Sequence, residues 1–143
     1  MQRNVPRPTD AELAILRILW ERGPSTVRHV HEQLARERAA AYTTALKLLQ
    51  IMTEKGLVER DERERTHVYK AKLSEDQTQR QLVRDLLDRA FGGSAGKLVM
   101  QALATKRASA DELREIRKVI DGVKGEREAR RGTHADDGAD ERD

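Results

Sequence analysis

Apolar residues recur at helical spacing through the first 55 residues, and two short breaks divide them. This spacing predicts a first helix up to about residue 22, where Gly23-Pro24 ends it, and a second over about 26–37. A third helix is predicted over about 41–55, before Gly56, a residue type that closes many helices. Each helix would bury one apolar face, formed by Leu13, Leu16, Leu19 and Trp20, by Val27, Val30 and Leu34, and by Ala45, Leu48, Leu49 and Met52.

Polar residues mark where two helices begin. Thr9 and Glu12 have the spacing of a capping box, in which each side chain bonds the backbone N–H of the other residue. Ser109 and Glu112 repeat that spacing before the last apolar stripe. Helix starts are therefore predicted at about residues 10 and 110.

After Gly56 the spacing changes from that of a helix to that of a strand. Residues 57–60 and 66–72 predict two short strands, and the second alternates as a half-buried strand should. The charged residues 61–65 connect them. A β-hairpin is thus predicted directly after the third helix.

Helical spacing returns after residue 73. An apolar stripe over about 75–91 predicts a helix that Gly92-Gly93 ends, and a short helix and a longer one over about 110–123 follow. Residues 124–143 hold only Ala as apolar residues beside Gly and charged groups, so a disordered tail is expected there. A loosely held arm is expected over 1–8.

The predicted elements follow the order of a winged helix-turn-helix domain: a first helix, two helices joined by a turn, and a β-hairpin. The predicted fold class is mainly α with a small β-hairpin wing, and the DNA-binding domain occupies residues 9–73. The third helix would be the recognition helix, whose N-terminal end enters the major groove of double-stranded DNA.

The charge distribution agrees with this assignment but would not make it alone. The formal net charge is only +3, yet residues 1–73 carry 14 Lys and Arg against 10 Asp and Glu, whereas residues 126–143 carry 4 against 7. The positive excess therefore lies where the helix-turn-helix pattern lies, as a surface that meets phosphates requires.

Several classes of protein are disfavoured by what the chain lacks. It has no Cys, which excludes disulfides, thiolate metal sites and cysteine nucleophiles. No apolar run approaches the roughly 18 residues that a membrane span needs, and no signal peptide is apparent. No carboxylates or His residues have catalytic or metal-ligand spacing. We therefore expect a soluble cytoplasmic protein without membrane insertion, with no catalytic residues, no metal and no cofactor.

The outer face of the third helix supplies candidate DNA contacts. A rotation of about 100° per residue turns its polar side chains away from the buried face. Gln can pair with adenine, Lys with guanine or phosphate, Thr with base edges or phosphate, and Leu with a thymine methyl. The alternative is a set of solvated residues on an ordinary helix. The candidates are Tyr42, Thr43, Thr44, Leu46, Lys47 and Gln50.

The hairpin supplies two further candidates at its tip, Arg63 and Arg65. Their guanidinium groups suit phosphate or minor-groove contact. The alternative is a solvated hairpin whose charges pair with one another, because acidic residues alternate with the basic ones along it.

Six short segments between Leu13 and Gly93 occur in a recognisable order, and the resemblance that they carry covers roughly residues 9–123. No single segment is specific, but their combination resembles the BlaI/MecI penicillinase-repressor family of winged-helix regulators. The segments are Leu13-Ala14-Ile15-Leu16 with Leu19-Trp20, Thr26-Val27-Arg28-His29-Val30-His31, Ala41-Tyr42-Thr43-Thr44-Ala45-Leu46, Lys55-Gly56-Leu57-Val58, His67-Val68-Tyr69 and Phe91-Gly92-Gly93.

The resemblance implies a dimeric repressor in which each protomer places one recognition helix on half of a palindromic operator. It assigns residues 74–123 to a helical dimerisation domain. A chain with 37% hydrophobic residues has a limited core, which oligomerisation often completes. The alternative is an intramolecular helical core. The residues assigned to dimerisation are Leu82, Leu86, Phe91, Leu113, Ile116 and Ile120.

The resemblance also implies a mode of release. In antibiotic-responsive members of the family, a membrane sensor-protease system causes cleavage at an Asn-Phe bond in the short C-terminal helix. The matching position here is Gln101-Ala102, which makes these two residues the candidate cleavage site, although both differ from that pattern. Copper-responsive relatives release DNA through C-terminal cysteines, which this chain lacks.

Two other functions compete with the repressor hypothesis. A ligand-sensing winged-helix regulator would bind a small molecule between its C-terminal helices, but only 3% aromatic residues argue against a sizeable pocket. A winged-helix scaffold for protein contacts would show no salt-dependent DNA binding.

Overall fold

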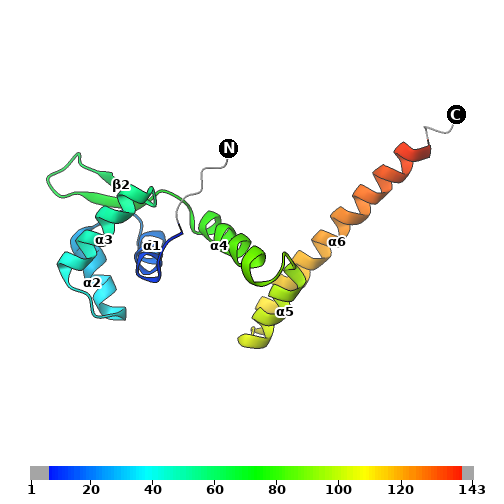
Figure 1. Ribbon diagram of the computed structural model, residues 1–143, viewed down its shortest axis with the longest axis horizontal. Coiled ribbons are helices and arrows are strands. Elements are labelled where there is room, and N and C mark those ends of the chain that lie inside the picture. The colour runs from blue at the N-terminus through cyan, green and yellow to red at the C-terminus, as the bar shows by residue number, and fades with distance from the viewer. Residues whose placement is uncertain (1–6, 140–143) are drawn as a thin grey trace. The chain divides into compact units, whose positions relative to one another are not determined.

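The computed structural model describes residues 7–139, with side chains through residue 132. The chain divides into two compact units, Met1–Gly93 and Ser94–Asp143. The expected arm over 1–8 and the end of the expected tail, 140–143, lie largely or wholly outside the described residues. The first unit contains the predicted helix-turn-helix and hairpin (Figure 1).

Three helices form most of the first unit: α1 (Asp10–Arg22), α2 (Val27–Glu37) and α3 (Tyr42–Lys55). They pack against one another, and α2 buries the apolar face that its spacing predicts. The predicted face of α1 was only half right, because Leu16 and Leu19 are buried whereas Leu13 and Trp20 are half-buried. Ile15 and Ile18 are buried on α1 as well. Leu48 is the one predicted core position of α3 that is only half-buried. The buried cluster comprises Ala14, Ile15, Leu16, Ile18, Leu19, Val27, Val30, Leu34, Ala45, Leu49, Met52, Leu57, Val58 and Tyr69.

The wing is a three-stranded antiparallel sheet rather than a two-stranded hairpin. β2 (Val58–Asp61) and β3 (Val68–Ala71) are the predicted pair, and β1 (Ser25–Thr26) adds to the other edge of β3. Ser25 lies opposite Tyr69 in this register. A strand of two residues has no periodicity that a sequence pattern can reveal, so it was missed. The added strand fixes the sheet to the turn between α1 and α2.

Side chains close the ends of the helices as the capping patterns predict. Thr9 accepts from the Glu12 N–H, and the Glu12 carboxylate accepts from the Thr9 N–H, so the capping box of α1 is complete. Thr26 caps α2. At the other end of α3, Gly56 has φ 81° and ψ 18°, the left-handed conformation that favours glycine.

Glu12 has a second role that its place in a capping box did not reveal. Its side chain is only 1% exposed, and its Oε1 accepts from Lys55 Nζ, at the last residue of α3, over 2.8 Å. Burial acts to raise the pKa of the Glu12 carboxyl, but the hydrogen bonds from Lys55 and Thr9 outweigh it and lower that pKa below its ordinary value. The pair therefore joins the start of α1 to the end of α3.

The helix α4 (Glu75–Ala90) belongs to the first unit, although the sequence assigned residues 74–123 to one separate domain. It packs against α1, and Asp85 pairs with Arg7 over 3.4 Å. Trp20 Nε1–H donates to the Leu73 carbonyl over 3.0 Å, which holds the start of α4 close to α1. Gly92 and Gly93, both with positive φ, end this unit.

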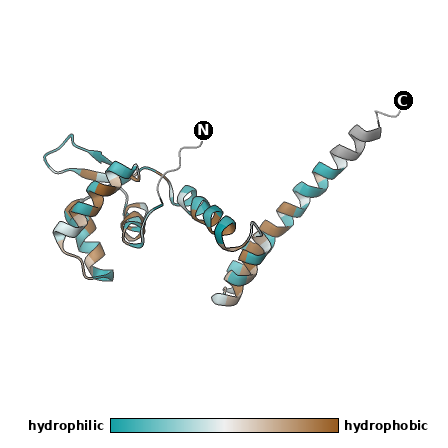
Figure 2. Cartoon of the chain, viewed as in Figure 1, coloured by the Kyte–Doolittle hydropathy of each residue, from teal (hydrophilic) through white to brown (hydrophobic). Residues whose placement is uncertain are grey.

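The second unit consists of α5 (Ala95–Thr105) and α6 (Ala110–Ala139). In Figure 2 apolar positions recur along α5 and the first part of α6, yet none of the described side chains of this unit is buried. The tail expected to be disordered from residue 124 is helical through Ala139. Ala, Glu, Lys and Arg are good helix formers, and no Pro interrupts them, so helix propensity offsets the low hydrophobicity there.

Candidate nucleic-acid interface

A polar stripe runs along the side of α3 that faces away from the core. Thr43, Lys47 and Gln50 are all exposed, and their i, i+4, i+7 spacing places them on one face of the helix. Thr44 is exposed beside them. Because Ala45, Leu49 and Met52 bury the opposite side, the stripe cannot turn inward without unpacking the core. This arrangement is the one that the sequence predicts for a recognition helix.

Leu46 differs from the other candidates on this helix. It is half-buried and packs against the core cluster. A rotation of about 100° per residue places it next to Ala45, at the edge of the buried face rather than in the middle of the exposed one. Leu46 therefore faces away from the core only in part, and its packing leaves part of the side chain accessible.

The start of α3 has no side-chain cap. Ala41 occupies the N-cap position, whereas Thr9, Thr26 and Ser74 cap α1, α2 and α4. The first intrahelical bonds come from the N–H groups of Thr44 and Ala45 to the Ala41 carbonyl, so those of Tyr42 and Thr43 have no acceptor within the helix. Tyr42 is 47% exposed at this end.

The wing carries both free and paired charges. Glu59 and Lys70 lie directly opposite each other on β2 and β3, and their side chains pair over 3.4 Å. Arg60 pairs with Glu62. Close to the sheet, therefore, the charges of the wing do pair with one another, as the alternative interpretation expects.

The two arginines of the wing tip differ from each other. Arg63 Nε lies 3.8 Å from Asp61 Oδ1, but its side chain is 91% exposed. Its backbone N–H donates to the same oxygen over 3.0 Å. This bond to the Asp61 side chain stabilises the turn of the wing, which contains no Gly or Asn. Arg65 is exposed, and within the described part of the chain it has no ion-pair partner.

The candidate dimerisation residues fall into two groups. Leu82 is half-buried and, with Leu13 and Trp20, lines a groove between α1 and α4, while Phe91 is half-buried at the end of that unit. In the second unit Leu113 and Ile120 are each 48% exposed and Ile116 is half-buried. These three, with Leu103, Arg114 and Arg117, line an open groove of about 310 Å³. Leu86 is 45% exposed on α4.

The candidate cleavage site lies inside α5. Gln101 and Ala102 are both exposed, and the Gln101 carbonyl accepts from the Thr105 hydroxyl over 2.6 Å. The Ala102 carbonyl accepts from the Lys106 N–H over 3.2 Å. The bond between them is therefore accessible but helical, and a protease that binds extended chain would have to unwind this turn.

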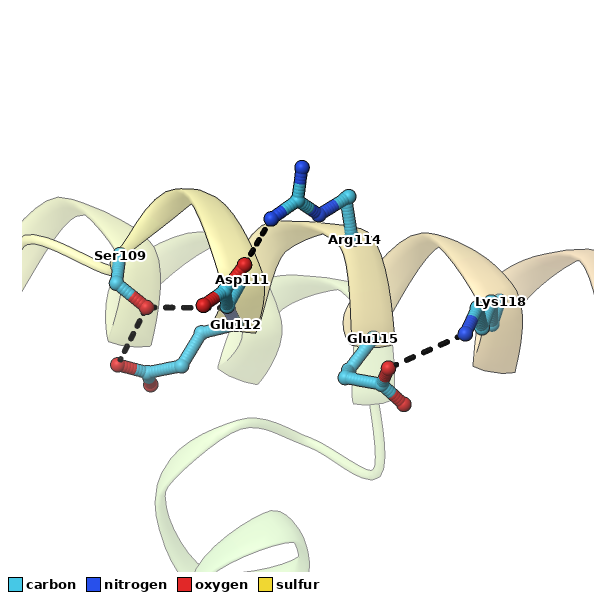
Figure 3. Close-up of polar contacts among 6 residues, drawn as sticks. All are labelled: Ser109, Asp111, Glu112, Arg114, Glu115 and Lys118. Atoms are coloured by element: carbon cyan, nitrogen blue, oxygen red, sulfur yellow. Dashed lines mark hydrogen bonds and ion pairs between the residues drawn. The ribbon is translucent and has the colours of Figure 1, made fainter.

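Acidic side chains near the start of α6 contact polar and basic residues of the same segment. The Ser109 hydroxyl donates to Glu112 Oε1 over 3.3 Å, Arg114 pairs with Asp111, and Lys118 pairs with Glu115 over 3.3 Å, as Figure 3 shows. Ser109 Oγ also accepts from the Glu112 N–H over 3.1 Å. Such pairs along one helix stabilise it weakly. Among the described residues no group of His, Asp and Glu is placed to hold a metal ion. In the same part of the chain no helix is long and apolar enough to cross a membrane.

Three packed helices, a three-stranded wing and a third helix with an exposed polar face define a winged helix-turn-helix protein of the DNA-binding class. A model of the penicillinase repressor family matches residues 8–122, and the chain belongs to this family. Members of the family are transcriptional repressors and not enzymes, so the chain is a DNA-binding repressor.

The chain is similar to the following proteins. The chain is 33% identical over 118 residues to the transcriptional regulator BlaI of Mycobacterium tuberculosis (strain CDC 1551 / Oshkosh), covering 82% of this chain and 85% of that protein. It is 20% identical over 119 residues to the penicillinase repressor of Bacillus licheniformis, covering 83% and 93%. The solution structure of the monomeric form of B. licheniformis BlaI with the blaP half-operator shares 21% identity and a TM-score of 0.46, over 52% of this chain and 92% of that one.

Proposed function

We propose that the protein represses transcription as a homodimer that places one α3 of each protomer in the major groove of a palindromic operator. The observation that carries this proposal is the stripe of Thr43, Lys47 and Gln50 on the outer face of α3. Two-fold symmetry then separates the half-sites by about one or two turns of DNA, roughly 10 or 20 base pairs. Such a protein acts in the bacterial cytoplasm, where the chromosome lies.

Base and phosphate contacts divide between two parts of the surface. Lys47 and Gln50 reach base edges, where Lys suits guanine and Gln suits adenine. The unbonded N–H groups of Tyr42 and Thr43 are free to donate to a backbone phosphate, since nothing caps that end of α3. Arg65, and Arg63 through its exposed guanidinium, contact the phosphates beside the groove.

The dimer forms mainly through the second unit. Within this unit several large apolar side chains are exposed: Val119 is 66% exposed, Met100 71% and Val123 55%. Exposed apolar residues at this density mark an interaction surface, and a second copy offers the same surface. The competing explanation is an intramolecular core, in which these side chains would pack within one chain.

A test of the dimer separates association from folding. Ile120→Asp places a charge in the apolar groove of α6 and should yield a monomer by sedimentation, with an unchanged winged-helix unit by near-UV circular dichroism. Ala129→Asp adds the same charge to the same helix beyond Val123, its last large apolar residue, and should remain dimeric. A dimeric Ile120→Asp variant would remove this groove from the interface.

Release of DNA by proteolysis in α5 follows from this dimer, with a sensor-protease system as the regulatory partner. A cut at Gln101-Ala102 removes α6 and with it most of the apolar surface. Both residues are exposed, but the turn must unwind before a protease can bind it. Purified repressor cut at this bond should therefore sediment as a monomer and lose operator affinity.

Capture of fragmented genomic DNA by the purified protein, sequenced at low and moderate salt, tests the proposed function. A recurring palindrome whose capture falls steeply with salt supports a phosphate-contacting dimer. Uniform weak capture without a motif would overturn the proposal and favour a non-specific binder or a protein-interaction scaffold.

A further inference from the structure

The turn that leads into the recognition helix has little means of fixing its own shape. It consists of Arg38 and three alanines, residues 39–41. Its end residues, Arg38 and Ala41, have extended backbones, with ψ values of 148° and 156°. No alanine side chain can hydrogen-bond, and Ala41 cannot cap α3. What holds this turn must therefore come from outside it.

One side chain of α2 contacts the turn and the first residue of α3 together. His31 Nε2 lies 3.0 Å from the Ala40 carbonyl oxygen. A carbonyl only accepts, so Nε2 carries the hydrogen and donates it. The same imidazole meets the Tyr42 ring at 80°, with centroids 5.8 Å apart, the edge-to-face geometry that aromatic rings prefer.

These contacts act on a residue at the proposed DNA surface. Tyr42 is the first residue of α3, and its side chain is 47% exposed. An exposed ring without a neighbour samples several rotamers, and ordering it on binding costs affinity. Contact with the half-buried His31 restricts Tyr42 before DNA arrives, because His31 is itself held by its bond to Ala40.

We propose that His31 is a positioning residue for operator recognition, which orders the α2–α3 turn and the Tyr42 ring without touching DNA itself. The inference rests on the proposed function, since it concerns how the same surface is prepared for DNA. It predicts that the effect of His31 on affinity passes through Tyr42.

The test is a double-mutant cycle on operator affinity, using the full chain at a temperature where circular dichroism shows each variant folded. His31→Leu should weaken binding roughly 5- to 10-fold and Tyr42→Leu about 10-fold. A tenfold loss corresponds to about 1.4 kcal/mol of binding free energy. The double variant should bind no more than about two-fold more weakly than Tyr42→Leu, because the two effects share one contact. The slope of affinity against salt should not change in His31→Leu, since no phosphate contact is lost.

Two further variants keep the test decisive. His29→Leu removes an exposed imidazole of the same helix, away from the turn, and should change affinity less than two-fold. His31→Phe keeps a ring against Tyr42 but loses the donor, and should bind between wild type and His31→Leu. If His31→Leu does not fold, an affinity of His31→Phe equal to that of wild type would by itself overturn a role for the Ala40 bond.

Losses that add in the double variant, or an unchanged affinity in His31→Leu, would overturn the positioning role while tight wild-type binding still supports the proposed function. Absence of operator binding by the wild type would overturn the proposed function and this inference with it.

Discussion

Replacing Lys55 with Met should destabilise the first unit far more than the loss of an ordinary surface lysine. The substitution keeps an unbranched side chain, one atom shorter, but removes the ammonium group that faces Glu12. Glu12 is 1% exposed, and its Oε2 already has no hydrogen-bond partner among the described residues. The variant therefore leaves a buried carboxylate held only by Thr9.

The expected loss is about 3 kcal/mol in the free energy of unfolding. Removing one partner of a buried ion pair typically costs about 3–5 kcal/mol. Lys55 is 29% exposed and Glu12 keeps its bonds to Thr9, so the lower end of that range applies. Glu12→Gln should cost only about 1 kcal/mol, because the amide oxygen can still accept from the Thr9 N–H. The double variant should resemble Glu12→Gln.

The pH dependence gives the prediction a sign. In the wild type the pKa of Glu12 is lowered, so the unfolded state binds the proton more readily, and the contribution of the pair to stability is lost as pH falls through the folded-state pKa. Without Lys55 that pKa should rise, because burial then acts with less opposition. The stability difference between wild type and Lys55→Met should consequently narrow as pH falls from 7 toward 4.

Urea unfolding followed by circular dichroism at several pH values measures these differences. Lys47→Met is the matched control, since it removes an exposed lysine from the same helix and should change stability by no more than about 0.5 kcal/mol. A loss below about 1 kcal/mol in Lys55→Met, or a difference that widens at low pH, would refute the stabilising role of the buried pair.

Three further predictions concern the core, the DNA surface and the dimer. Leu49→Ala, at a fully buried position, should lower the free energy of unfolding by about 3 kcal/mol, measured by urea unfolding. Lys47→Ala should weaken operator binding about 10-fold without changing the dimer, whereas Lys118→Ala, which removes the same charge from α6, should bind normally; equal affinities would remove Lys47 from the contacts. A chain ending at residue 100 should be monomeric and bind operator weakly, while one ending at residue 123 should keep most of its affinity; an undiminished affinity of the shorter chain would place the dimer interface elsewhere.

Local patterns in the sequence sufficed for most of the first unit. Helical spacing located α1, α2 and α3, and the Thr9 capping box and Gly56 marked two helix ends correctly. The exposed positions of Lys47 and Gln50 followed from the same spacing. These features depend on residues within a few positions of each other, so the sequence alone determines them.

Features that join distant segments needed the tertiary structure. β1 is a strand only because β3 lies beside Ser25 and Thr26. The pairing of Glu12 with Lys55 spans 43 positions, and a capping pattern predicts only the local half of its bonds. Leu46 is half-buried because neighbouring elements reach the edge of its helix, which a rotation angle alone does not report.

In the second unit, too, some features follow from the sequence and others only from the structure. The sequence located its helices but predicted disorder after residue 123 from low hydrophobicity alone. That prediction was wrong because the helix propensity of Ala, Glu, Lys and Arg favours the helix that continues to Ala139. The sequence also predicted that its apolar stripes form a dimer interface, and within this unit α5 and α6 leave many of these side chains exposed. Periodicity thus determined which faces of the helices are apolar. Only the tertiary structure decided which of these faces are buried, because burial depends on what packs against each face.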